Sequence, residues 1–223
     1  MRLLVLDTET TGLKVEEGHR LIEIGCVEVR NRQVSETHFH YLLNPEREVD
    51  EGATAVHGFT WDRLKTQPRF ADVAEQFLQF VQGATLIIHN APFDTGFIDA
   101  ELKRLGQSPL KQHAHQVIDS LAMARELHPG QRNSLDALCQ RYGVSNEHRV
   151  LHGALLDAQL LADVYLAMTR GQDSLKMSEE DDPAEQAMSL RDLGLQDLVV
   201  RRANDLEIEA HDAFLTGMLK SKR

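Results

Sequence analysis

Residues 2–7 read RLLVLD, residues 21–30 read LIEIGCVEVR and residues 33–43 read QVSETHFHYLL. Aliphatic and β-branched side chains dominate these three segments, partly in alternation, and turn-forming residues separate them. Three consecutive strands joined in this way predict an antiparallel meander. A fourth segment, TLIIHN at 85–90, is short and apolar, which is typical of a strand buried on both faces.

Helical patterns lie on both sides of this fourth segment. The predicted helices cover residues 71–81, 93–105, 120–127, 134–142 and 153–169. Pro129-Gly130 and Gly143 end two of them. Strands followed by helices that cross back to the sheet predict an α/β domain, with a mixed sheet covered by helices.

The composition is that of a globular protein: 223 residues, 42% hydrophobic side chains and a net charge of -11. This charge argues against a broad basic face for duplex DNA, so any contact with nucleic acid should be local. The sequence has no long apolar segment and no signal-peptide pattern at its start, which predicts a soluble, cytoplasmic protein. Cys26 and Cys139 stand alone in apolar surroundings, so we expect reduced core residues.

The character of the chain changes after residue 170. Residues 171–194 are rich in acidic side chains and predict a flexible linker. Residues 195–223 regain apolar side chains at roughly helical spacing, which indicates a helical segment that docks on a partner. The alternative is a helix that folds back on its own domain.

Two carboxylates lie at the end of the first predicted strand. Asp7 and Glu9, in DTET at 7–10, are two residues apart and therefore project from the same face of a strand. Two such acids repel each other unless a cation bridges them. Taken alone, the pair is equally typical of the solvated face of a strand.

Two further segments add an acid or a histidine near the start of a helix. Asp94 closes HNAPFD at 89–94, where its alternative role is that of an N-cap. His152 and Asp157 open and close HGALLD, where they could equally be ordinary residues of a helix entry. Together the segments supply four carboxylates and one histidine at strand ends and helix starts, where side chains of an α/β domain can converge.

These three segments, DTET, HNAPFD and HGALLD, resemble the three exonuclease motifs of the DEDD superfamily. The histidine five residues before the last aspartate is the mark of the DEDDh branch. GHRLIEIGCVEVRNR, AVHGFT and GQRNSLDALC are similar to one subgroup, the proofreading subunits of bacterial DNA polymerase III. The resemblance implies a metal-dependent 3′→5′ DNA exonuclease. It also implies a ribonuclease-H-like exonuclease fold over residues 1–170, with a mixed five-stranded sheet whose first three strands are antiparallel.

The resemblance also implies roles for individual residues. Two divalent cations, Mg²⁺ or Mn²⁺, would be held by four carboxylates: Asp7, Glu9, Asp94 and Asp157. His152 would act as the general base. Contacts to the substrate would come from the following residues: Asp7, Thr8, Glu9, Thr10, Gly12, His57 and Asp157. Family members can carry a glutamate five residues before the equivalent of His57, where this chain has Gly52 beside Glu51.

Four more residues in these motifs are expected to have supporting roles. We expect His89 and Asn90 to shape the site, and Asp119 and Asp136 to be capping or structural residues.

Partners follow from the same resemblance. The substrate would be a single-stranded or frayed 3′ end of DNA, and residues 195–223 would dock on the polymerase catalytic (alpha) subunit in the bacterial replisome. Gln172, Leu175 and Met177 have the spacing of a sliding-clamp-binding peptide. A small accessory subunit is a further expected partner. Two alternatives stay open: an enzyme that trims RNA or short oligonucleotides, and a scaffold whose carboxylates are relics.

Overall fold

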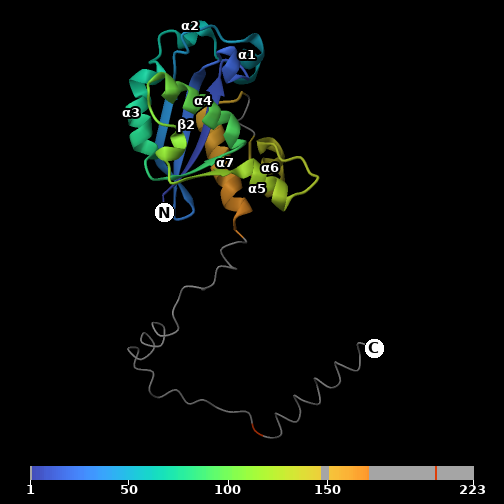
Figure 1. Ribbon diagram of the computed structural model, residues 1–223. Coiled ribbons are helices and arrows are strands. Elements are labelled where there is room, and N and C mark those ends of the chain that lie inside the picture. The colour runs from blue at the N-terminus through green and yellow to red at the C-terminus, as the bar shows by residue number, and fades with distance from the viewer. Residues whose placement is uncertain (1, 147–150, 171–203, 205–223) are drawn as a thin grey trace, which may run out of the picture. The chain divides into compact units, whose positions relative to one another are not determined.

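A five-stranded mixed sheet forms the centre of the computed structural model, which describes residues 2–146 and 151–170 together with Asn204. The strand order is β3-β2-β1-β4-β5. Figure 1 shows the sheet with helices packed around it. The strands span Leu3–Thr10 (β1), Leu21–Arg30 (β2), Gln33–Leu42 (β3), Thr85–Ile88 (β4) and Gln116–Asp119 (β5). The helices span Glu51–His57 (α1), Trp61–Leu64 (α2), Phe70–Val81 (α3), Ala91–Arg104 (α4), Ser120–Leu127 (α5), Leu135–Tyr142 (α6) and Ala154–Met168 (α7).

The direction of pairing changes at β1. β1 pairs antiparallel with β2, and β2 pairs antiparallel with β3, which confirms the predicted meander. β1 then pairs parallel with β4, and β4 pairs parallel with β5. The carboxyl ends of β1, β4 and β5 therefore lie at one edge of the sheet, and the residues after those strands are brought together there.

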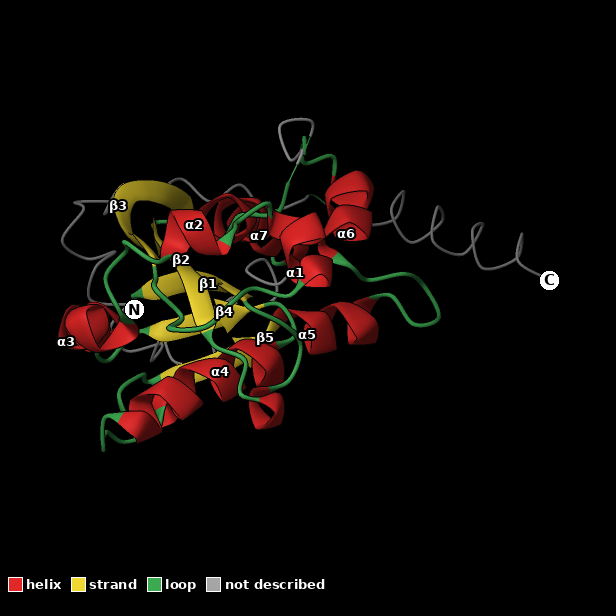
Figure 2. Ribbon diagram, turned by 90° about the horizontal axis from the view of Figure 1, so that it is seen from above, coloured by secondary structure: helices red, strands yellow, loops and turns green. Residues whose placement is uncertain are grey.

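Two apolar clusters cover the two faces of the sheet. Alternate residues of β1 enter different clusters, Leu4 and Leu6 on one face and Val5 on the other, because successive side chains of a strand point to opposite faces. α3 and α4 pack on the Leu4 face, where Phe77 is fully buried. α6 and α7 pack on the Val5 face, and Figure 2 shows α7 across the sheet from α4.

The predicted strands at 2–7, 21–30, 33–43 and 85–90 are confirmed as β1 to β4, and the long predicted helices are confirmed with ends shifted by a few residues. β1 runs three residues further than predicted, to Thr10. The pattern of the residues did not locate β5, because its four residues, QVID, lack the length and bounding turns that mark a strand. α1 and α2, both short, were also not predicted.

The linker at 171–194 and the clamp-binding peptide lie outside the described residues, as does the docking segment at 195–223 apart from Asn204. The domain boundaries predicted from the sequence therefore stay predictions. Within the described ranges, no helix is long and apolar enough to cross a bilayer.

Candidate active site

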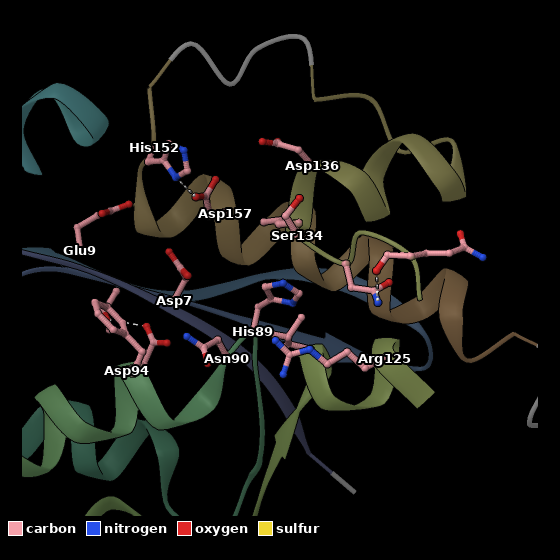
Figure 3. Close-up of a pocket in the computed structure, with 16 residues that line it drawn as sticks. Asp7, Glu9, His89, Asn90, Asp94, Arg125, Ser134, Asp136, His152 and Asp157 are labelled. Carbon is pink, nitrogen blue, oxygen red and sulfur yellow. Dashed lines mark hydrogen bonds and ion pairs between the residues drawn. The ribbon is translucent and has the colours of Figure 1, made fainter. Parts of the chain in front are cut away.

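A cleft of about 600 Å³ opens where β1, β4, α5, α6 and the start of α7 meet (Figure 3). All five residues predicted to be metal ligands or general base line this cleft. Its lining consists of Asp7, Thr8, Glu9, His89, Asn90, Phe93, Asp94, Leu121, Arg125, Gln131, Asn133, Ser134, Leu135, Asp136, His152 and Asp157.

Asp7 and Glu9 reach the cleft from the last residues of β1. They are paired across the antiparallel ladder with Gly25 and Glu23, and both are half-buried, whereas their neighbour Thr8 is buried. The two-residue spacing therefore places both carboxylates on one face, as predicted. The strand does not end at Asp7 but continues to Thr10, so the ladder holds the backbone on both sides of the pair.

Asp94 enters the cleft from the first turn of α4. The N-cap of this helix is Asn90, in a left-handed conformation with φ of 66°, so Asp94 is not the N-cap. The Asp94 side chain is only 3% exposed, and the Thr8 hydroxyl donates a hydrogen bond of 2.7 Å to its Oδ1. The pKa of Asp94 is raised to about 7, mainly by burial and to a smaller extent by the charge of Asp119, while the hydrogen bond from Thr8 opposes the rise.

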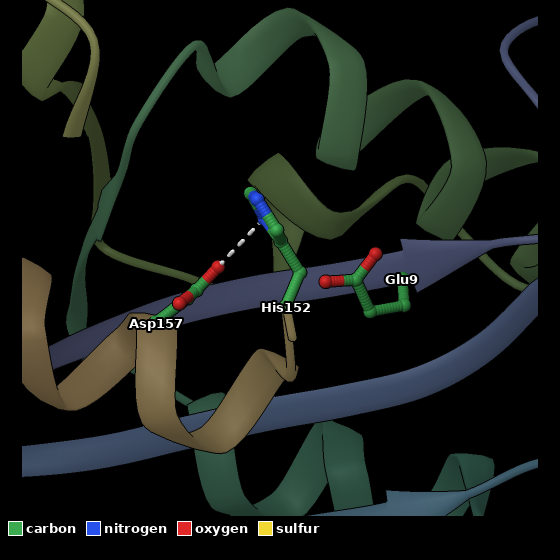
Figure 4. A group of neighbouring side chains, drawn as sticks. All are labelled: Glu9, His152 and Asp157. Atoms are coloured by element: carbon green, nitrogen blue, oxygen red, sulfur yellow. Dashed lines mark ion pairs between the residues drawn. The ribbon is translucent and has the colours of Figure 1, made fainter. Parts of the chain in front are cut away.

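His152 and Asp157 come from the entry of α7. His152 Nδ1 lies 3.3 Å from Asp157 Oδ2, and the Asp157 side chain is buried while that of His152 is 43% exposed (Figure 4). One possible ligand atom from each of Glu9, His152 and Asp157 lies within 4.8 Å of the others. Residues separated by more than 140 positions thus form one compact group of donors.

Two residues of β2 determine where α7 begins. Glu23 is 4% exposed, and its Oε2 accepts a hydrogen bond of 3.0 Å from the Ala154 backbone N–H at the first turn of α7. Gly25 lies against the same turn, since a Cβ added there would be 2.3 Å from the Ala154 carbonyl carbon. Sequence reasoning did not single out either residue. An acid between Ile22 and Ile24 in a buried strand was the available signal.

A second pocket of about 530 Å³ adjoins the cleft, and Glu9 and Phe93 line both. It also contains Thr10, Gly12 and His57, three of the residues predicted to contact the substrate. The Thr8 side chain lines the main cleft instead, where its hydroxyl binds Asp94.

The family position five residues before His57 falls in the second pocket. Gly52 lines it, whereas Glu51 is exposed and does not. The glutamate found at that position in other family members therefore has no direct replacement in this lining.

The His57 side chain can donate a hydrogen bond in this pocket. Its ring is 4% exposed, and Nδ1 accepts a hydrogen bond of 3.0 Å from the Phe59 backbone N–H. Burial lowers the pKa of His57, so the ring is neutral and carries its proton on Nε2. Among the described residues, Nε2 has no hydrogen-bond partner. The Thr10 backbone raises the pKa of His57, but this effect is smaller than that of burial.

A model of the exonuclease family matches residues 4–165. The chain belongs to the exonuclease family. The DNA polymerase III subunit epsilon of Pasteurella multocida is 47% identical over 231 residues, covering 100% of this chain and 91% of that protein. The protein of the same name from Escherichia coli is 48% identical over 223 residues, covering 96% of this chain and 92% of its own length.

A solved structure has a similar fold at low sequence identity. The nuclease domain of 3′hExo, described as a DEDDh family member bound to rAMP, gives a TM-score of 0.66 at 17% identity. The match covers 76% of this chain and 92% of that domain. The ribonuclease-H-like fold expected from the motifs is confirmed.

DEDDh exonucleases generally use divalent metal ions, and the donor set of this exonuclease fits such ions. Carboxylate oxygens are hard ligands of the kind that Mg²⁺ and Mn²⁺ prefer. Three donor side chains already lie within 4.8 Å of one another, Glu9, His152 and Asp157, and Asp7 lines the same cleft. A cation would also offset the cost of ionising the buried Asp94 carboxyl.

The remaining predicted residues have supporting roles. Asp119 is the N-cap of α5 and accepts hydrogen bonds from the Leu121 and Ala122 backbone N–H groups, which confirms the predicted capping role. Asp136 accepts a hydrogen bond of 3.0 Å from the Asn146 side chain and also lines the cleft.

His89 contacts a neighbouring side chain, and both cysteines lie in the protein interior. His89 Nδ1 lies 3.1 Å from the Ser120 hydroxyl. Cys26 and Cys139 are buried and are not joined in a disulfide, as expected.

Proposed function

We propose that this exonuclease removes mispaired 3′-terminal deoxynucleotides from DNA in the 3′→5′ direction, as the proofreading subunit of DNA polymerase III. The observation that carries the proposal is the convergence of Asp7, Glu9, Asp94, His152 and Asp157 in one cleft. Relatives named DNA polymerase III subunit epsilon, which match this chain over nearly all of its length, support the biological role.

We further propose that two divalent cations, Mg²⁺ or Mn²⁺, are held by Asp7, Glu9, Asp94 and Asp157. When bound, such a pair supplies charge stabilisation to both the attacking and the leaving oxygen of a phosphodiester. Burial makes ionisation of Asp94 costly, and the Thr8 hydroxyl offsets part of this cost by donating to the charged form. The β1 ladder and the α7 entry keep the other three carboxylates in place.

His152 is the proposed general base. Its ring is partly exposed at the mouth of the cleft, so it can accept the proton of the attacking water and pass it to solvent. A neutral imidazole has one unprotonated ring nitrogen, which can accept that proton. The Asp157 carboxylate, 3.3 Å from Nδ1, orients the ring.

The second pocket is the proposed site for the terminal nucleoside. Thr10, Gly12 and His57 line it, and Leu13 adds an exposed apolar side chain suited to stack on a base. The Nε2–H of His57 is available to a sugar or phosphate oxygen. A nucleoside here would place its 5′ phosphate beside Glu9, which lines both pockets.

The activity is tested with the purified chain on a primer-template that has a mispaired 3′ end, against a matched end and an RNA oligomer, with and without Mg²⁺. We expect metal-dependent release of 5′-mononucleotides, fastest from the mispaired end. Asp7→Ala and His152→Ala should each lower the rate by orders of magnitude while circular dichroism shows a retained fold. Near-normal cleavage by either variant would refute the proposed catalytic site. A strong preference for RNA would favour the alternative of an enzyme that trims RNA.

The partner proposals rest on the part of the chain after residue 170. Residues 195–223 would hold the domain near the polymerase catalytic subunit, where tethering raises its effective concentration. We expect deletion of residues 180–223 to abolish a pull-down of that subunit, and an unchanged pull-down would refute the docking role.

The clamp-binding peptide is tested separately. Gln172→Ala combined with Leu175→Ala should weaken binding of the sliding clamp without changing cleavage of a free oligonucleotide.

A further inference from the structure

Among the described residues that line the acidic cleft, one carries a permanent positive charge. Five carboxylates line it: Asp7, Glu9, Asp94, Asp136 and Asp157. Among the lining residues, Arg125 is the one arginine or lysine side chain. In a chain with a net charge of -11, this local positive charge is the feature of the cleft best suited to an anionic strand.

Arg125 lies in the last turn of α5, is exposed, and makes no hydrogen bond or ion pair with any residue that the structure describes. Arg20 and Arg69, by contrast, are paired with Glu101 and Asp72. The guanidinium of Arg125 therefore keeps its donors free for a ligand, and its planar fork suits a phosphate.

The position of Arg125 relates it to the reaction centre. Figure 3 shows its side chain extending from α5 toward His89, at the opposite end of the cleft from Glu9. The second pocket adjoins the Glu9 end. With the terminal nucleoside in the second pocket and the scissile phosphodiester at the carboxylates, the rest of the strand must run toward Arg125.

The walls at this end favour one path for the strand. Asp136 lies on the α6 side, where its charge repels a phosphate, and Arg125 lies on the α5 side (Figure 3). The connecting loop is held by Asn133, which is 7% exposed. Its amide group donates to the His128 and Gln131 carbonyls, and its Oδ1 accepts from Arg141. The wall beside Arg125 is therefore fixed before substrate arrives.

We propose that Arg125 binds the phosphodiester group next upstream of the scissile one. This inference rests on the proposed function, because it takes its direction from the cleavage of a 3′ end at the carboxylates. It makes Arg125 a substrate-binding residue that distinguishes a strand from a dinucleotide. A dinucleoside monophosphate has only the scissile phosphodiester, so it offers Arg125 nothing to bind.

The experiment uses the full chain with Mg²⁺ and three single-stranded DNA oligomers of one sequence. The first is unmodified, the second carries an uncharged methylphosphonate at the linkage next to the scissile one, and the third carries it one linkage further upstream. A charge-assisted hydrogen bond predicts that Arg125→Ala lowers kcat/KM on the unmodified oligomer by about 10- to 100-fold. The uncharged linkage of the second oligomer should lower kcat/KM of the wild type by a similar factor. It should lower kcat/KM of Arg125→Ala by no more than about twofold, because the variant has already lost the contact to that phosphate.

Three controls make the test specific. Arg104→Ala removes an exposed arginine at the end of α4 that does not line the cleft, and it should leave all three rates unchanged. Arg125→Lys should retain part of the activity, because a lysine keeps the charge but not the fork. Arg125→Ala should cleave a dinucleoside monophosphate as fast as the wild type.

Several results would overturn the inference. An equal penalty from the second oligomer in wild type and Arg125→Ala would show that Arg125 does not contact that phosphate. Coupling to the third oligomer instead would place the contact elsewhere. If the wild type cleaves none of the oligomers, the proposed function fails. Equilibrium binding of the same oligomers with Ca²⁺ in place of Mg²⁺ then still tests the coupling, and its absence there would refute the Arg125 contact independently.

Discussion

At the scale of single residues, two properties of His57 both favour its neutral form. Its Nδ1 hydrogen bond to the Phe59 backbone fixes the ring, while burial makes the charged ring unfavourable and lowers its pKa. A buried histidine that must stay neutral links folding to pH. The same neutrality leaves Nε2–H available as a donor in the second pocket.

His57 therefore predicts an acid-sensitive contribution to stability. The pKa of the folded state lies below the value of about 6.5 of the unfolded chain, so protons bind preferentially to the unfolded state. The contribution of His57 to the free energy of unfolding should therefore fall as the pH decreases from 7 to 5, while the raised pKa of Asp94 shifts stability in the opposite direction. His57→Gln stays neutral over this range and keeps the Asp94 effect, so the stability of the wild type relative to this variant should decrease as the pH falls, in urea denaturation with EDTA present. A pH-independent difference between the two proteins would contradict the assignment.

At the scale of elements, the contact between β2 and α7 positions the last catalytic motif. Gly25 lets the helix approach the strand, and Glu23 accepts a hydrogen bond from the backbone N–H of Ala154, the first residue of that helix. An anionic side chain at a helix N-terminus also interacts favourably with the helix dipole. His152 and Asp157 take their positions from this contact.

Gly25→Ala tests the close approach. The added Cβ would meet backbone atoms that cannot move without shifting α7, so we expect a loss of about 1–3 kcal/mol and a large loss of activity. Gly96→Ala is the matched control, because Gly96 is an exposed position of α4 and a Cβ there would meet nothing within 4 Å. It should stabilise the protein by about 0.4–1 kcal/mol with unchanged activity. Thermal melts and cleavage rates of both variants check this.

Glu23→Ala tests the polar half of the same contact. It leaves the buried Ala154 N–H without its acceptor, which should cost about 1–3 kcal/mol. Glu23→Gln keeps an oxygen acceptor and should retain more stability and more activity than Glu23→Ala. His40→Ala removes the other partner of Glu23. The His40 Nε2 lies 2.7 Å from Glu23 Oε1 and its side chain is 35% exposed, so this change should have the smaller effect. If all three variants cleave DNA normally, Glu23 has no positioning role.

At the scale of the whole molecule, metal binding by the proposed ligands Asp7, Glu9, Asp94 and Asp157 would stabilise the folded state. A ligand that binds only the folded state stabilises it by about 2.7 kcal/mol at 100 times its dissociation constant. For a chain of this size that corresponds to a rise of roughly 5–10 °C in Tm. We therefore expect Mg²⁺ or Mn²⁺ to raise the Tm of the wild type, and EDTA to remove both the rise and the activity.

A pair of variants separates binding in the cleft from general effects of salt. Asp7→Asn removes a proposed ligand and should lose most of the metal-dependent rise in Tm. Asp62→Asn changes an exposed carboxylate of α2 that does not line the cleft, and should keep the full rise. Equal rises in the two variants, measured by calorimetry, would show that the cations bind elsewhere.

Much of the fold could be predicted because its signals are local. β-branched alternation in 21–30 and the apolar run at 85–90 depend on neighbours within a few positions, and both are confirmed as strands. β5 could not be found in this way, because its four residues owe their conformation to pairing with β4. The five acid and histidine positions were predicted from motifs, and their common location in one cleft agrees with that prediction.

The sequence by itself determined which residue types stand at each motif, and therefore the family and the chemistry that the site can perform. Only the tertiary structure decided which of these residues share a cleft, that Thr8 binds Asp94, and that Glu23 and Gly25 position α7. Within the part of the chain that the structure describes, it also left Arg125 without an ion-pair partner in a cleft lined by five carboxylates. The physical reason is range: these contacts join residues far apart along the chain, whose proximity depends on sheet pairing and helix packing rather than on local preference.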